Sequence, residues 1–136
     1  MSEQLPTPTP ATTLETETFW EAAAEGRFIL PRCNECDEVI WYPRLFCPAC
    51  GSNDVGWFEA SGQGTVYSFT VVERGQGGWK DHSPYVLAYV ELAEGPRMLT
   101  NVIDIDPDDV AVDMAVSVRF DPGKDGGNLV RFGPAS

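Results

Sequence analysis

Apolar and polar residues alternate with a period of two along the second half of the chain. From Val86 to Leu92, every second residue is Val, Ala or Leu, with other side chains between them. Such alternation is typical of strands that bury one face. Segments of this kind are bounded by Gly, Pro or Asp, and we predict five strands at residues 65–73, 85–92, 97–105, 116–120 and 129–132.

A short helical turn is expected between the third and fourth strands. Asp106 precedes Pro107 there, and Asp at an N-cap followed by Pro at the first helical position starts a helix well. Five strands with a small helical element at this place are typical of an OB-fold barrel. A five-stranded Greek-key sandwich is the competing interpretation.

A short helix is predicted at about Phe19 to Glu25. Thr18 and Glu21 have the spacing of a capping box, and Gly26 is a suitable end. Seven residues are too few for a stable isolated helix, so it must dock. Phe19 and Trp20 would pack either on the rest of this chain or on another protein.

Three regions are expected along the chain. Residues 1–17 contain alternating Thr and Pro without an apolar repeat and should form an extended, mobile tail unless something holds it. Residues 18–60 would hold the helix and a small cysteine-containing unit. Gly62 and Gly64 then interrupt the pattern, and residues 61–136 would form the barrel.

All four cysteines of the chain form two Cys-x-x-Cys pairs, Cys33 with Cys36 and Cys47 with Cys50. Two such pairs separated by a short loop provide four thiolates for one tetrahedral metal, so we predict a rubredoxin-like zinc ribbon. Iron, a metal-free site and paired disulfides are the alternatives. Residues 39–42 would form a strand of a hairpin in the loop. Four thiolates leave no open coordination position on the metal, which indicates a structural role.

Charge and length restrict the classes of function. The chain has 136 residues and a net charge of −12, from nine basic and twenty-one acidic side chains. Nucleic-acid binding depends on Lys and Arg, so a single-stranded nucleic-acid-binding OB protein is disfavoured. No apolar run is long enough to span a bilayer, and the N-terminus does not resemble a signal peptide. Grouped cysteines fit a reducing compartment, so we expect a cytoplasmic protein that does not bind membranes.

No catalytic constellation is evident. His82 is the only histidine, and the cysteines are assigned to the metal. Asp104, Asp106, Asp108 and Asp109 lack the spacing of a calcium loop and suit a solvated turn. Residues 74–84, which include Trp79 and Lys80, form a long connection that is either an ordinary surface loop or one ordered by a partner or ligand.

Several motifs together resemble a known family, and the resemblance covers about Phe19 to Phe120. The family is the zinc-ribbon/OB-fold family once catalogued as a domain of unknown function, the thirty-fifth of that series. The motifs are Phe19-Trp20, Gly26-Arg27-Phe28, Arg32-Cys33-x-x-Cys36, Tyr42-Pro43-Arg44, Cys47-Pro48-x-Cys50-Gly51-Ser52, residues 64–72 and Pro84-Tyr85-Val86.

The resemblance implies a non-catalytic accessory subunit of a thiolase-fold enzyme. The partner would be a thiolase-like enzyme of the lipid-transfer-protein type, and the two proteins would form a hetero-oligomer. The enzyme would act on an acyl-CoA as an aldolase, thiolase or acyltransferase, in steroid side-chain or lipid degradation. The four cysteines match the metal ligands of the family. Candidate partner contacts are Phe19, Trp20 and Trp79.

Candidate CoA contacts rest on chemistry alone. Basic side chains would hold phosphates, and an indole would stack on the adenine; the residues are Arg27, Arg32, Arg44, Lys80 and Trp41. The acidic chain should bind CoA weakly without a partner. A stand-alone acyl-CoA-binding module is the alternative function, and measurable CoA affinity of the isolated chain would favour it.

Overall fold

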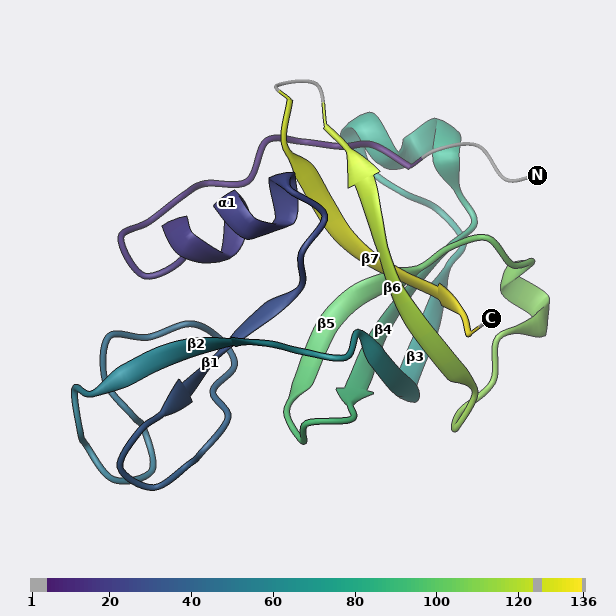
Figure 1. The fold of residues 1–136 in the computed structure, drawn as a ribbon. Helices are drawn as coiled ribbons and strands as arrows, with labels where there is room; N and C mark the ends of the chain where they lie inside the picture. The colour runs from purple at the N-terminus through teal and green to yellow at the C-terminus, as the bar shows by residue number, and fades with distance from the viewer. Residues whose placement is uncertain (1–4, 124–125, 136) are drawn as a thin grey trace.

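The computed structural model describes residues 5–123 and 126–135. Residues 1–4 of the expected tail and residues 124, 125 and 136 of the expected barrel region lie outside the described residues. The elements (Figure 1) are α1 (Glu17–Ala24), β1 (Ile29–Cys33), β2 (Val55–Glu59), β3 (Gln63–Val72), the 3₁₀ helix η1 (Gly77–His82), β4 (Tyr85–Leu92), β5 (Arg97–Val102), the 3₁₀ helix η2 (Pro107–Asp109), β6 (Ala115–Pro122) and β7 (Asn128–Pro134).

The last five strands form a closed barrel in the order β3-β4-β5-β7-β6. Neighbours pair antiparallel except β5 and β7, which are parallel and meet at Val102 and Phe132. The barrel closes where β3 pairs with β6. This closed barrel confirms the predicted OB-fold over the sandwich.

The period of two correctly predicted which residues of β4 fill the barrel, whereas β3 departs from it because its register shifts between Val66 and Ser68. Val86, Ala88, Val90 and Leu92 of β4 are each at most 2% exposed. The predicted turn between the third and fourth strands is η2, where the Asp106 carboxylate accepts a hydrogen bond from the backbone N–H of Asp108 at 2.9 Å.

Helix α1 begins earlier than its sequence suggests. The N-cap is Thr16, which is 1% exposed, and its hydroxyl accepts a hydrogen bond from the backbone N–H of Thr13 at 2.9 Å. The predicted capping box of Thr18 and Glu21 is wrong, because the turn at Thr13 to Thr16 starts the helix first and places Thr18 inside it. The predicted end is confirmed, since Gly26 follows the helix with a φ of +75°.

The ribbon strands are not those predicted. β1 and β2 flank the cysteine region and pair from Ile29 with Glu59 to Cys33 with Val55. Residues 39–42, expected as a strand, contribute only one bridge, between Val39 and Arg32. The side chain of Ile40 is 2% exposed and packs with Cys33 and Cys47.

A single hydrophobic cluster connects the helix, the ribbon and the barrel. Phe19 of α1, Phe28 and Leu30 belong to the same buried cluster as Val66 and Phe132 of the barrel. The rings of Phe28 and Phe132 meet edge to face, with centroids 6.1 Å apart. In Figure 1, α1 and the β1–β2 ribbon lie on the same side of the barrel. The ribbon is therefore held in a defined place by shared apolar burial.

Candidate functional site

The two cysteine pairs lie in two similar turns. The backbone N–H of Asp37 donates to the carbonyl of Cys33 at 3.0 Å, and that of Gly51 donates to the carbonyl of Cys47 at 2.8 Å. Asp37 and Gly51 have φ angles of +65° and +80°. Each Cys-x-x-Cys pair is thus closed by a residue in the left-handed region, for which glycine is the easiest choice.

The four thiols converge on one point. Their Sγ atoms all lie within 4.8 Å of one another, and the Cys33–Cys50 and Cys36–Cys47 sulfur distances are both 3.6 Å. A tetrahedral zinc with Zn–S bonds of ~2.3 Å requires S···S separations of about 3.8 Å. The thiols therefore fit a zinc ion, and they would hold it as thiolates without a position for substrate.

The backbone around the thiols supports the negative charge that metal binding requires. Cys33 and Cys47 are fully buried, whereas Cys36 and Cys50 are exposed. The backbone N–H groups of Glu35 and Ala49 donate to the Sγ atoms of Cys33 and Cys47 at 3.4 and 3.3 Å. Such hydrogen bonds favour the thiolate form.

The clustered thiols do not ionise equally. Burial raises the pKa of the Cys47 thiol, but hydrogen bonds from the backbone N–H groups of Cys50 and Ala49, and from the thiols of Cys36 and Cys50, lower it to about 7. A backbone hydrogen bond at Glu38 lowers the pKa of Cys36, but burial and the neighbouring thiols raise it to about 12. Neighbouring thiols thus hinder one another's ionisation, and a bound dication would offset this effect because it favours the thiolate form.

Zinc binding is expected to weaken as the pH falls, and to weaken more steeply below about 7. Because the pKa of Cys47 is lowered in the folded, metal-free protein to about 7, its thiolate is present above that pH and is lost as the pH falls through it. Competition with a chromophoric zinc chelator on either side of pH 7 would measure this. Equal zinc affinity at both pH values would contradict the prediction.

The candidate partner contacts lie in different surroundings. Phe19 is 3% exposed, and its ring lies against Trp20, Trp41 and Phe28 with centroids 5.0, 5.1 and 6.3 Å away. The structure thus places Phe19 in the core of its own chain, as the first of the two interpretations expected. Its ring has little surface left for a partner.

Trp79 lies in η1 and not on an open loop. Its ring packs against Tyr85 with centroids 4.7 Å apart, and the hydroxyl of Ser83 accepts a hydrogen bond from the backbone N–H of Gly75 at 2.6 Å. The same hydroxyl donates to the carbonyl of Trp79 at 3.2 Å. The segment 74–84 is therefore closed by hydrogen bonds between its own residues.

The candidate CoA contacts are not arranged as one anion site. Arg27 forms ion pairs with Glu59 and Glu25 at 2.6 and 3.1 Å, and hydrogen bonds to Glu59 and then Glu25 raise its pKa. The guanidinium of Arg32 stacks 4.6 Å from the centroid of Phe58.

The remaining three candidates are similarly dispersed. Arg44 and Lys80 are exposed, and Trp41 lines a cavity different from the one that Arg27 lines. The predicted stacking and phosphate roles of these residues stay predictions.

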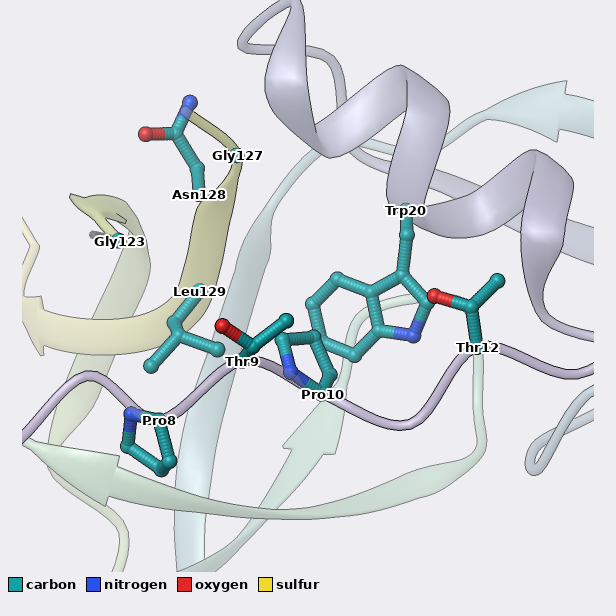
Figure 2. A pocket seen from close by; sticks show the side chains of 9 residues that line it. All are labelled: Pro8, Thr9, Pro10, Thr12, Trp20, Gly123, Gly127, Asn128 and Leu129. Atoms are coloured by element: carbon teal, nitrogen blue, oxygen red, sulfur yellow. The ribbon is translucent and has the colours of Figure 1, made fainter. Parts of the chain in front are cut away.

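The N-terminal tail covers one face of the barrel. Arg131 of β7 is 3% exposed; it pairs with Asp121 and donates a hydrogen bond to the carbonyl of Pro6. Figure 2 shows the indole of Trp20 pointing from α1 toward the tail at Pro10, beside a cavity of about 180 Å³. The tail is thus held over β7, and Trp20 is half-buried beneath it.

Two families match consecutive parts of the chain. The ChsH2 rubredoxin-like zinc ribbon domain matches residues 20–56, and the ChsH2 C-terminal OB-fold domain matches residues 57–121. A solved chain described as "Ltp2-ChsH2(DUF35) aldolase" superposes with a TM-score of 0.85 at 35% identity, and the match covers 94% of this chain and 100% of that one.

Curated relatives share the same region. A probable enoyl-CoA hydratase alpha subunit of Thermomonospora curvata is 38% identical, covering 80% of this chain and 34% of its own. A DUF35 domain-containing scaffold protein of Pyrococcus furiosus is 32% identical, covering 77% of both chains. The benzoylsuccinyl-CoA thiolase subunit BbsA of Thauera aromatica is 32% identical, covering 75% and 74%. The chain therefore spans about a third of the first relative and about three quarters of the other two.

Among the described residues, no helix is long and apolar enough to cross a membrane.

Proposed function

Because this chain belongs to the family of ChsH2 zinc-ribbon and OB-fold proteins, we propose that it is a non-catalytic accessory subunit of a thiolase-fold enzyme. The observation that carries the proposal is the match, over 94% of this chain, to a chain described as an Ltp2-ChsH2(DUF35) aldolase. The names of two relatives, a scaffold protein and a thiolase subunit, support the same role.

The chemistry of the site supports an accessory role. The four cysteines fit a metal shell, which leaves no free thiol as nucleophile. His82 is the only histidine of the chain, and among the described residues its Nδ1 atom has no hydrogen-bond partner. A histidine that acts as a base is usually oriented by a carboxylate that accepts a hydrogen bond from this atom. The catalytic residues would then belong to the partner.

The substrate of the complex would be an acyl-CoA, in lipid or steroid side-chain degradation. Benzoylsuccinyl-CoA and enoyl-CoA, named for two relatives, are both CoA thioesters. This chain would contribute little CoA affinity alone, because Arg27 is already paired with two carboxylates and the net charge is −12. The enzyme and this subunit would bind the thioester as a hetero-oligomer.

A tagged form of the chain should recover a thiolase-fold enzyme from an extract of its own source. The expected result is one thiolase-like protein in a stoichiometric complex, identified by mass spectrometry and absent when the tag alone is used. A chain that recovers no such protein, yet binds acyl-CoA in calorimetry by itself, would overturn the proposal in favour of a stand-alone acyl-CoA-binding module.

A further inference from the structure

The outer face of β3, β4 and β5 exposes large apolar side chains. Tyr67, Leu87, Tyr89 and Leu99 are 47%, 36%, 47% and 54% exposed. Leu87, Tyr89 and Leu99 alternate with residues that fill the barrel, so they point outward. Tyr67 is exposed at an irregularity in β3. Adjacent exposed apolar side chains of this size are typical of interaction surfaces.

The four side chains form one surface, which we call the sheet face. Tyr89 pairs with Leu99 across β4 and β5, and with Ser68 across β3 and β4. Tyr67 lies at a register shift between Val66 and Ser68. β-Bulges of this kind redirect a side chain.

The sheet face carries little unpaired charge. The guanidinium of Arg97 stacks 3.8 Å from the ring centroid of Tyr67. The same guanidinium pairs with Glu91 at 3.2 Å. A neutral, aromatic surface on a chain with a net charge of −12 resembles the desolvated centre of a protein interface.

A crevice between the ribbon and the barrel adjoins the sheet face. Its volume is about 530 Å³, and its lining includes Trp41, Glu38, Glu94 and Arg97. Because Arg97 both lines the crevice and stacks on Tyr67, the two features are continuous.

Glu94, which lines this crevice, has one carboxylate oxygen without a hydrogen-bond partner among the described residues. Its Oε2 atom accepts a hydrogen bond from the backbone N–H of Ser61 at 2.8 Å. Its Oε1 atom is buried and has no hydrogen-bond partner among the described residues. A buried carboxylate oxygen without a donor is costly, so a donor from outside the chain would be favourable.

The charges indicate a different protein rather than a second copy. Glu38 and Glu94 make the crevice acidic, while Arg97 is already paired with Glu91. A second copy would bring another net charge of −12, which opposes close approach. A partner with a Lys or Arg beside an apolar patch complements both features.

We propose that the thiolase-fold enzyme docks on the sheet face and the adjoining crevice. The enzyme places apolar side chains over Tyr89 and Leu99, and a Lys or Arg side chain enters the crevice beside Glu38 and Glu94. This inference rests on the proposed function, and it replaces Phe19 as the anchor of the interface.

The first test locates the interface directly. Tyr89 is replaced by the photo-crosslinking residue p-benzoylphenylalanine, and the chain is mixed with the purified thiolase-like enzyme that the tagged chain recovers. A crosslink to the enzyme is expected from position 89. The same replacement at Val112, which is 55% exposed in the β5–β6 connection, should give none. Equal crosslinking from both positions, or none from position 89, overturns the inference.

The second test measures affinity. Leu99→Asp should weaken binding to the same enzyme at least ~10-fold, because it places a charge in the apolar centre. Val112→Asp has the same charge change at nearly equal exposure, 55% against 54%, and should leave binding unchanged. Glu94→Gln should weaken binding by a smaller factor and reduce its dependence on salt. An unchanged melting temperature and zinc content will show that the variants fold.

The outcomes separate the two proposals. If the wild-type chain recovers no thiolase-like enzyme, the proposed function fails and this inference fails with it. If the wild-type chain binds the enzyme and Leu99→Asp binds equally well, only the inference fails. If the chain alone forms a dimer that Leu99→Asp dissociates, the sheet face joins two copies and the inference is overturned.

Discussion

Replacing Cys47 with serine is expected to abolish zinc binding and to unfold the ribbon. Cys47 is fully buried and holds its sulfur 3.6 Å from that of Cys36. Structural zinc sites contribute ~10–16 kcal/mol of apparent binding energy, comparable with the ~5–15 kcal/mol net stability of a whole domain. Zinc content and the melting temperature would measure the loss, and solubility should fall as Ile40 and its neighbours become exposed.

The matched control is Asn53→Ser, which also introduces a serine into the ribbon. Asn53 is exposed, so zinc content and melting temperature should stay at the wild-type values. A Cys47→Ser variant that keeps the wild-type melting temperature would contradict a structural metal.

Phe28→Ala is expected to cost about 3–5 kcal/mol of the free energy of unfolding, as large-to-small core substitutions of Phe do. Phe28 is 4% exposed and packs between Phe19 of α1 and Phe132 of β7. Its loss should leave a cavity where the helix, ribbon and barrel meet. Denaturant unfolding followed by far-UV circular dichroism would give the free-energy change.

The cooperativity of unfolding gives a second measurement of how strongly the helix, ribbon and barrel depend on one another. Because the three elements share one cluster, zinc release and barrel unfolding should occur in one transition in the wild type. Phe46→Ala is the control, since Phe46 is 52% exposed in the cysteine loop and should cost little. Zinc release at a lower denaturant concentration than barrel unfolding, in the wild type, would show two independent units instead.

The proposed interface changes how the aromatic residues are interpreted. The family motif contains Phe19 and Trp20, but the structure uses Phe19 to join the helix to the shared core. Trp79 is likewise packed on Tyr85. On the sheet face, Tyr67, Tyr89 and Leu99 keep free surface. Their strands were predicted from the sequence without a role for these side chains.

Local features were predictable wherever a short stretch of sequence decides them. Two Cys-x-x-Cys pairs form a metal site because the intervening residues can close only a tight turn, and Gly51 provides the left-handed φ angle that this turn needs. Val86 to Leu92 form a strand with one buried face because successive side chains point to opposite sides. The zinc ribbon, the barrel strands and the η2 turn follow from such rules.

The remaining features depend on which segments meet in space. Residues 39–42 are apolar enough for a strand, yet β1 pairs instead with β2, over twenty residues further along the chain. The start of α1 depends on the burial of Thr16 against the rest of the protein.

The sequence by itself determined the metal ligands and the two faces of β4. Only the tertiary structure decided which outer face is covered, because a period of two distinguishes inside from outside but does not say what lies against the outside. The tail reaches β7 because Arg131 binds the carbonyl of Pro6, whereas Tyr89 and Leu99 on the sheet face stay exposed. The crevice at Glu94 likewise lies where the ribbon, which shares a buried cluster with the barrel, adjoins the β4–β5 turn.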